Sequence, residues 1–197
     1  MIAKYQIEFE ERRHLYRVNG VLKDSTTQVL ELLQAYKGVP DAVLKPKAEF
    51  GDNGHRMISF FIKGTLDETT VPPALRPHLE RFKIWYWGNP LWEKGEPESE
   101  VRMFHPDLNK CGTADLLWGP ELLDIKFGYW KEWYVGPQTA CYAEMREAMF
   151  GVKTEKRKVL YPGVDGWKTA LLDDKNDIRI FRELNKTYDL IKQWKGK

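Results

Sequence analysis

The sequence predicts a mixed α/β fold with a largely helical N-terminal half. Apolar residues at helical spacing occupy much of the first 90 positions, whereas short alternating stretches typical of strands follow residue 97. One helical stretch interrupts those strands, which gives the order strand, strand, strand, helix, strand. The chain has 197 residues, 42% of them hydrophobic, and no Gly/Ser linker divides it. We therefore expect a single domain over residues 1–197.

The first predicted elements are a β-hairpin and a helix. Apolar residues alternate over residues 5–22, and Asn19-Gly20 is a typical hairpin turn. A helix should begin at Asp24-Ser25, because Ser25 and Gln28 have the spacing of a capping box, and it should stop near residue 38. Further helices are predicted over residues 47–62 and from Pro72-Pro73 to about residue 88.

The second half of the chain is predicted to contain most of the sheet. Gly136-Pro137 opens a helix that runs to about residue 150, because proline is tolerated in the first turn of a helix. Strands are predicted at residues 98–105, 111–118, 121–127, 157–161 and 167–172, and a C-terminal helix at about residues 177–194.

The composition excludes several classes of protein. Lys and Arg number 31 against 29 Asp and Glu, a net charge of +2, which excludes a polybasic coating protein but permits a local basic groove. Aromatic residues make up 13%; they pack in cores, and their faces also stack on nucleobases. Two cysteines, Cys111 and Cys141, are too few for a disulfide framework, a four-cysteine zinc site or an iron–sulfur cluster.

The same features predict a soluble protein of the reducing cytoplasm. The stretch from Met1 to Glu8 alternates and carries charge early, unlike the apolar core of a signal peptide. No apolar run approaches the roughly 20 residues that a membrane span needs. We therefore expect no membrane partner.

Two acidic residues and a lysine form the strongest candidate site. Side chains alternate across a strand, so Asp124 and Lys126 share one face while Leu123 and Ile125 take the other. Asp115 lies on the preceding strand, joined by a short turn, so the two carboxylates can converge on one cation. Hard oxygen ligands of this kind favour Mg²⁺ or Mn²⁺. Taken alone, a D-x-K pattern is more often a surface charge pair.

Four further residues strengthen this site. Gln138 and Tyr142 are four residues apart on a predicted helix and therefore lie on one face. His55 follows two glycines, which permit close approach of a ligand to the backbone, and Glu100 lies on the first predicted strand of the sheet. Each has an ordinary alternative. A lone helical histidine is more often structural, and Gln138 and Tyr142 alone are more often surface and core residues.

In this order, the motifs resemble the PD-(D/E)XK nuclease superfamily, in particular its RecB-like and lambda-exonuclease-like branch. That branch carries a helical histidine after a Gly-rich stretch, then G-x-x-D, then D/E-x-K after an apolar pair, then Q-x-x-x-Y on a helix. The corresponding residues here are Gly54-His55, Gly112-Thr113-Ala114-Asp115, Asp124-Ile125-Lys126 and Gln138-Thr139-Ala140-Cys141-Tyr142. The stretches His14–Gly20 and Ser25–Leu30 also look like the opening of phage and prophage members, so the resemblance covers roughly residues 10–165.

The sequence departs from that pattern in several places. Phe127-Gly128 follows the D-x-K motif where members often have Thr-Gly, so a phosphate contact from that hydroxyl is missing. Asp24 replaces a proline that often precedes the serine of the opening motif. The CRISPR-associated relatives with an iron–sulfur cluster use four cysteines, which excludes that subgroup here. The helix that begins at Asp177 has no counterpart in the pattern.

The resemblance implies a restriction-endonuclease-like core, with a central mixed sheet flanked by helices. It also implies that His55, Asp115 and Asp124 ligate Mg²⁺ or Mn²⁺, and that the backbone carbonyl of Ile125 completes the shell. Asp115, Asp124 and Lys126 would then be the catalytic residues, with Lys126 orienting the attacking water or stabilising the oxyanion.

Three more residues receive roles from the resemblance. Gln138 and Tyr142 would position the substrate strand or the lysine. Glu100 would be either a group in the outer coordination shell or an ordinary strand residue.

The function implied is that of a metal-dependent deoxyribonuclease, an exonuclease acting at DNA ends in phage-type recombination or repair in a bacterial cytoplasm. Its partners would be DNA and either a second copy of the chain or a single-strand annealing protein. The alternatives are a non-catalytic DNA-binding or recombination adaptor on the same fold, a structure-specific endonuclease, and an aromatic-rich protein-interaction domain. Loss of either carboxylate or of the lysine would favour the adaptor, and all three residues are present.

Overall fold

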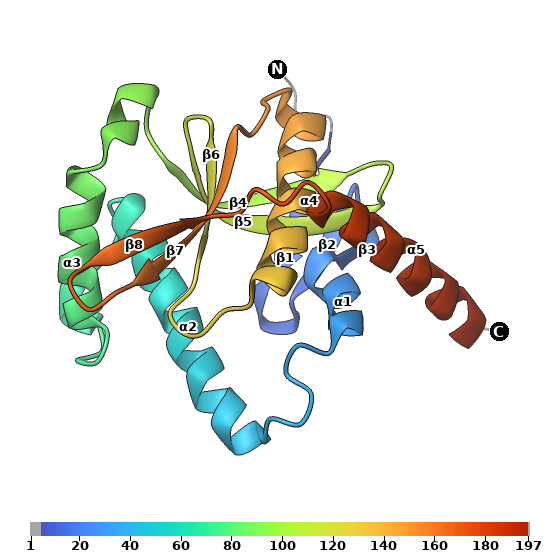
Figure 1. The fold of residues 1–197 in the computed structure, drawn as a ribbon, viewed down its shortest axis with the longest axis horizontal. Helices are drawn as coiled ribbons and strands as arrows, with labels where there is room; N and C mark the ends of the chain where they lie inside the picture. Colours follow the sequence, from blue (N-terminus) through green and yellow to red (C-terminus); the bar gives the residue numbers. More distant parts are fainter. Residues whose placement is uncertain (1–4, 197) are drawn as a thin grey trace.

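The computed structural model describes residues 5–196, which form an eight-stranded mixed sheet with helices on both faces (Figure 1). Residues 1–4 and 197 lie outside the described residues, and with them half of the stretch on which the signal-peptide expectation rests. The strands are β1 (Ile7–Glu10), β2 (Leu15–Val18), β3 (Val21–Ser25), β4 (Glu98–His105), β5 (Lys110–Trp118), β6 (Glu121–Ile125), β7 (Lys156–Pro162) and β8 (Trp167–Leu171). The α-helices are α1 (Thr26–Leu30), α2 (Asp41–Ile62), α3 (Arg76–Trp87), α4 (Glu132–Phe150) and α5 (Asp177–Lys195).

The sheet is mixed, as predicted. The strand order is β1-β2-β3-β5-β6-β7-β8, and β4 pairs with the other edge of β5. Strands β6 and β7 are parallel and are connected through α4, while most other neighbours are antiparallel. The N-terminal hairpin of β1 and β2 is present, and Asn19-Gly20 turns β2 into β3. Both turn residues have positive φ, as a tight hairpin turn requires.

A fork in the sheet places the candidate site. On the edge of β5 that faces away from β4, Cys111 pairs with Ser25 of β3, whereas pairing with β6 begins only at Leu116. The intervening residues, Gly112 to Asp115, have no strand partner on this edge among the described residues. The predicted G-x-x-D motif therefore lies where the sheet opens towards side chains from elsewhere in the fold.

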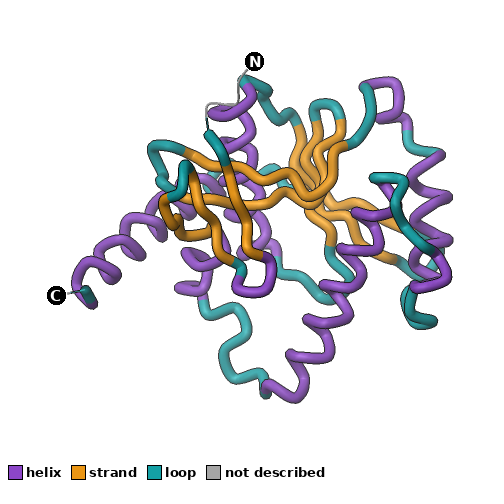
Figure 2. The backbone as a smooth tube through the Cα atoms, turned by 180° about the vertical axis from the view of Figure 1, so that it is seen from behind, coloured by secondary structure: helices purple, strands orange, loops and turns teal. Residues whose placement is uncertain are grey.

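Helices cover the two faces of the sheet with separate apolar cores (Figures 1 and 2). Adjacent residues of β5, Leu116 and Leu117, belong to different cores, as strand alternation requires. Helices α2 and α3 supply Met57, Ile58, Leu79, Phe82 and Tyr86 to one core. Helices α1, α4 and α5 supply Val29, Leu30, Cys141, Tyr142, Met145 and Phe181 to the other.

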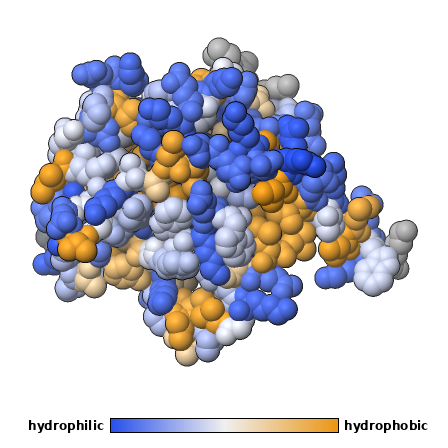
Figure 3. Space-filling model, viewed as in Figure 1, coloured by the Kyte–Doolittle hydropathy of each residue, from blue (hydrophilic) through white to orange (hydrophobic). Residues whose placement is uncertain are grey.

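One of the contacts that anchor helix α5 is an ion pair between a buried lysine and a partly exposed aspartate. Lys110 of β5 is 1% exposed, and its Nζ donates to Asp189 Oδ1 at 2.8 Å. Lys192, one turn further on, pairs with Asp24 of β3, and the end of the helix extends from the body of the molecule (Figure 3), with Leu190 and Trp194 exposed. Among the helices of residues 5–196, none is both long and apolar enough to cross a membrane.

Three predicted helix boundaries are wrong. The capping box of Ser25 and Gln28 is present, but α1 ends at Leu30 and a short 3₁₀ helix follows it. Helix α2 begins six residues earlier than predicted and α4 four residues earlier, and each contains a proline, Pro46 and Pro137, inside its second turn. A proline near a helix start removes one hydrogen bond close to an end that is already incompletely bonded, so the helix continues through it.

Candidate active site

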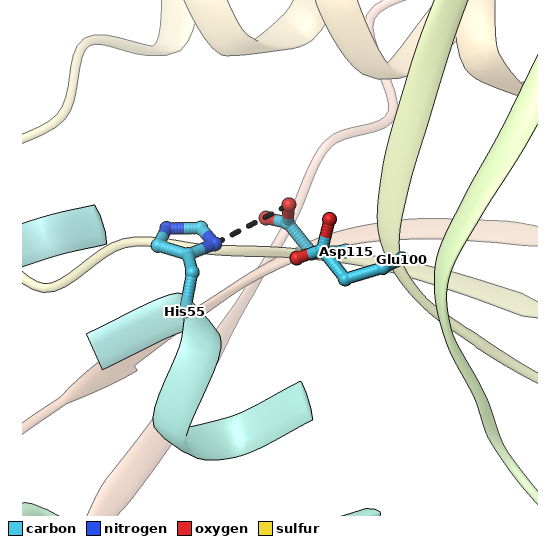
Figure 4. A group of neighbouring side chains, drawn as sticks. All are labelled: His55, Glu100 and Asp115. Carbon is cyan, nitrogen blue, oxygen red and sulfur yellow. Dashed lines mark ion pairs between the residues drawn. The ribbon is translucent and has the colours of Figure 1, made fainter. Parts of the chain in front are cut away.

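Three potential metal ligands converge at the fork of the sheet (Figure 4). His55 comes from α2, Glu100 from β4 and Asp115 from β5, and one ligand atom of each lies within 4.8 Å of the others. His55 Nδ1 is 3.4 Å from Asp115 Oδ1. All three side chains are partly buried. An imidazole nitrogen and two carboxylates at this spacing could hold a divalent cation.

The two oxygens of Asp115 have different neighbours. Oδ1 faces His55, while Oδ2 accepts a hydrogen bond from the backbone N–H of Ile125 at 2.6 Å. Because the ladder between β5 and β6 ends at the pair Leu116–Leu123, the Asp115 carboxylate takes the place of a backbone partner for Ile125. The carboxylate thus holds the end of β6 against the fork and still presents one oxygen to the site.

Glu100 lies directly opposite Asp115 on β4. The pairing of Ser99 with Leu116 and of Val101 with Ala114 has the same register, which leaves Glu100 facing Asp115. Its φ is +55°, a left-handed conformation that is uncommon for a residue with a side chain. Such conformations persist where the surrounding structure imposes them, and they concentrate at functional sites.

Asp124 and Lys126 share a face of the chain at the end of β6, as predicted. Lys126 Nζ lies 2.6 Å from Asp124 Oδ2, and Asp124 is buried. Asp124 is not part of the close group formed by His55, Glu100 and Asp115. The ammonium group therefore lies next to that group of ligands and is paired with a second carboxylate.

The site concentrates negative charge away from water. Burial raises the pKa of Glu100 to about 7, with a further contribution from Asp115, and burial raises the pKa of Asp124 to about 6 against the effect of Lys126. Burial acts to raise the pKa of Asp115 and to lower that of His55. The attraction between these two groups outweighs burial, so the pKa of Asp115 is lowered and that of His55 is raised. A bound cation would relieve this excess of carboxylates.

Positive charge surrounds one side of the group. Lys63 and Arg102 both oppose the rise in the pKa of Glu100, so their charges act at the site. Both residues are exposed. Two exposed cationic side chains of a near-neutral chain therefore lie within electrostatic range of the carboxylates.

The glycine before His55 accommodates a side chain rather than a ligand. A Cβ added at Gly54 would overlap the ring of Phe127, whereas a Cβ at Gly51 would meet no atom within 4 Å. Phe127, which stands where the resemblance has a threonine, also packs near His55, with ring centroids 5.9 Å apart. The expected approach of a ligand to this backbone is therefore wrong for Gly54, because Phe127 occupies the space.

Gln138 and Tyr142 form a buried pair behind the site. Gln138 is 7% exposed and Tyr142 is 4% exposed, and Gln138 Nε2 donates to Tyr142 Oη at 3.1 Å. The Tyr142 ring lies against Gly112, where a Cβ would overlap it. Because α4 begins at Glu132 and not at Gly136, Gln138 lies in the second turn of the helix and not in its first turn, as the predicted start would have placed it.

Most of the predicted site residues meet at the fork, and Glu100 lies closer to the candidate metal ligands than the sequence predicted. His55, Asp115, Asp124 and Lys126 act on one another electrostatically. Glu100, expected from the sequence only as an outer group or an ordinary strand residue, has a carboxylate oxygen within 4.8 Å of ligand atoms of both His55 and Asp115. A left-handed glutamate in a strand has no recognisable signal in one sequence, so only the pairing register reveals it.

Comparisons with known proteins reveal similarity in fold but not in sequence. No protein-family model matches the chain, and no curated protein is significantly similar to it. The crystal structure of a "putative exonuclease" from Eubacterium rectale superposes with a TM-score of 0.53 and 11% identity, covering 70% of this chain. The match spans 64% of the Eubacterium rectale chain. The structure of SSO0001 matches 84% of this chain and 83% of its own length at 15% identity, but its TM-score of 0.37 supports no conclusion.

The fold and the site together define a class: a mixed α/β protein with a nuclease-like fold and a His/Glu/Asp group that could bind a metal ion. At 11% identity the likeness to the Eubacterium rectale protein concerns the fold alone.

Proposed function

We propose that the protein is a metal-dependent deoxyribonuclease of the PD-(D/E)XK superfamily, an exonuclease acting at DNA ends in phage-type recombination or repair. The observation that carries this proposal is the group of His55, Glu100 and Asp115 beside the ion pair of Asp124 and Lys126. Carboxylates that can hold a divalent cation next to an ammonium group suit phosphodiester hydrolysis. The order of the sequence motifs supports the same assignment.

The donor set fits Mg²⁺ or Mn²⁺. Carboxylate oxygens suit both ions, and Mn²⁺ also accepts an imidazole nitrogen. His55, Asp115 and Asp124, with the Ile125 carbonyl, are the ligands that the motifs imply, and Glu100 is close enough to join them. A bound ion would lower the pKa of its water and stabilise charge on the scissile phosphate.

Lys126 supplies a hydrogen-bond donor that is fixed in place. Its pairing with Asp124 at 2.6 Å limits the positions that its flexible side chain can adopt. A fixed ammonium group stabilises the negative charge that builds on a phosphate oxygen during hydrolysis. In this proposal Lys126 binds that oxygen, and Asp124 holds the lysine as well as contributing to the metal site.

Gln138 and Tyr142 serve as positioning residues. Both are buried, and charges of Asp115 and Asp124 act on the Tyr142 hydroxyl, so the pair lies behind these carboxylates. Since Gln138 donates to Tyr142, the two side chains brace each other against Gly112. They keep the fork of the sheet at a fixed width.

Cleavage of two DNA substrates tests the proposal. End-labelled linear duplex and covalently closed circular duplex should be incubated with the protein in Mg²⁺, in Mn²⁺ and in EDTA. We expect nucleotides to be released from the linear DNA only, and only with metal. Asp124→Asn should abolish the reaction, while Asp165→Asn, at an exposed acid in the β7–β8 turn, should not.

Other outcomes would contradict parts of the proposal. Nicking of the circular DNA at the rate of linear cleavage would favour an endonuclease. DNA binding without cleavage in either metal would favour the non-catalytic adaptor.

A further inference from the structure

A second feature lies next to the candidate active site. A pocket of about 310 Å³ is formed where the chain leaves α1 and passes the start of α4. Its lining includes Leu30, Ala35, Tyr36, Lys37 and Tyr134, and we call it the aromatic pocket. None of the roles proposed above involves these residues.

Tyr134 connects the aromatic pocket to the site. Burial raises the pKa of the Tyr134 hydroxyl, the nearby Lys126 opposes that rise, and Tyr36 and Asp124 add to it. Tyr134 is thus within electrostatic range of both the candidate catalytic lysine and the opposite wall of the pocket. A chain that places a phosphate at Lys126 would have its neighbouring nucleotide near this pocket.

The walls of the aromatic pocket offer ring faces. Tyr36 is 50% exposed, and its ring centroid is 6.3 Å from that of Tyr134 at an angle of 59°. The two rings are therefore not stacked on each other. Trp133, 48% exposed, lies beside Tyr134 with centroids 6.5 Å apart. Exposed aromatic faces are unfavourable in water, and they are the surface on which unpaired bases stack.

Positive charge accompanies these rings. Lys131 Nζ donates to the Ala35 carbonyl at 2.6 Å and lies 5.9 Å from the Tyr36 ring centroid and 5.1 Å from that of Trp133. Lys37 is exposed at the edge of the pocket, and Glu31 is the one acidic residue in its lining. Lys37 and Lys131 thus outnumber the Glu31 carboxylate around the aromatic pocket, which suits a polyanionic chain with planar bases.

We infer that the aromatic pocket binds a base of single-stranded DNA next to the phosphate held at the active site. This inference rests on the proposed function for its substrate. A paired base has both faces covered by its neighbours in the duplex, so only an unpaired base can enter between aromatic rings. The pocket therefore binds an unpaired nucleotide, as in a single strand or at the opened end of a linear duplex.

Binding measured in EDTA tests this inference without cleavage. The probes are a fluorescent oligothymidine and a blunt-ended DNA hairpin of equal length. Tyr36→Ala should weaken oligothymidine binding about tenfold and leave hairpin binding unchanged, whereas Tyr36→Phe, which keeps the ring, should stay within about twofold of wild type. Trp194→Ala removes an even more exposed ring far out on α5 and should change neither affinity.

A second measurement reports stacking itself. Oligothymidine carrying one 2-aminopurine should lose fluorescence on binding wild type, and lose less on binding Tyr36→Ala. Equal oligothymidine affinities for wild type and Tyr36→Ala would overturn the inference even if the protein cleaves DNA. Conversely, a protein that never cleaves DNA but shows the Tyr36 dependence would refute the proposed nuclease and retain the pocket.

Discussion

The carboxylate of Asp115 accepts a hydrogen bond of 2.6 Å from the backbone N–H of Ile125, at the point where β5 and β6 separate. One side chain thereby performs a structural task and a chemical one. Its Oδ2 replaces a backbone acceptor at the end of β6, and its Oδ1 points to His55. The position of the Asp124–Lys126 pair relative to the other carboxylates therefore depends on Asp115.

The charge of Glu100 should lower the free energy of unfolding of the metal-free protein and strengthen its binding of a metal ion. Its carboxylate is buried opposite that of Asp115, so Glu100→Gln removes a like-charge repulsion. We expect the metal-free variant to be as stable as wild type or more stable, and its Mn²⁺ affinity to fall at least about tenfold. Chemical denaturation and calorimetric Mn²⁺ titration measure the two quantities.

Glu98→Gln, on the same strand but outside the close group, is the matched control for that experiment. It should leave Mn²⁺ affinity unchanged. If Glu100→Gln bound Mn²⁺ as tightly as this control, Glu100 would be an ordinary strand residue.

Two glycines three residues apart on α2 should respond oppositely to alanine. Gly54→Ala forces Phe127 to move, and we expect a loss of about 1–3 kcal/mol in the free energy of unfolding. Gly51→Ala meets no atom and improves helix propensity, so we expect a gain of up to about 1 kcal/mol. Urea denaturation of both variants measures the difference. A Gly54→Ala protein as stable as Gly51→Ala would show that Phe127 does not pack against this helix.

These examples show which features the sequence predicts and which it does not. Alternating apolar residues predict β4, β5 and β6 closely, because each strand has a face in a core. The sequence does not predict that Gly54 makes room for the ring of Phe127, because Phe127 lies 73 positions later in the chain. The start of α4 was misplaced because Pro137 is more often found in a first turn than in a second.

The site shows the same division. Motif order predicted Asp115, Asp124 and Lys126 because their spacing reflects two adjacent strands and a turn. The conformation of Glu100 arises from pairing between β4 and β5, which no local pattern encodes. The helical stretch that continues from α1 as a 3₁₀ helix likewise ends at Leu33, where Gln34 adopts a left-handed conformation.

Gln138→Ala should separate positioning from metal binding. The substitution leaves Tyr142 Oη without its donor and removes the side chain that holds the Tyr142 ring, which lies against Gly112. We expect turnover to fall roughly 10–100-fold, about 1.4–2.7 kcal/mol of transition-state stabilisation, with Mn²⁺ affinity nearly unchanged. Single-turnover cleavage and Mn²⁺ titration on the same protein measure both. Turnover at the wild-type rate would mean that the pair only fills space.

The ion pair between the buried Lys110 and the partly exposed Asp189 should help to anchor α5. Asp189→Ala leaves an ammonium group that is 1% exposed without its partner, and we expect a loss of about 3–5 kcal/mol in the free energy of unfolding. Glu183→Ala breaks an exposed pair with Lys186 on the same helix and should change stability by less than about 0.5 kcal/mol. Thermal or urea unfolding compares them. Equal effects would show that Lys110 finds another partner or reaches water.

If metal held at the fork of the sheet drives DNA hydrolysis, the rate of cleavage must depend on both the metal and its ligands. The rate of nucleotide release from end-labelled linear duplex should be followed as a function of Mn²⁺ concentration for wild type and for Asp115→Asn. We expect a rate that rises to saturation with Mn²⁺ for wild type and no detectable nucleotide release by a folded Asp115→Asn protein. Cleavage by wild type in EDTA, or equal rates for the two proteins, would contradict it.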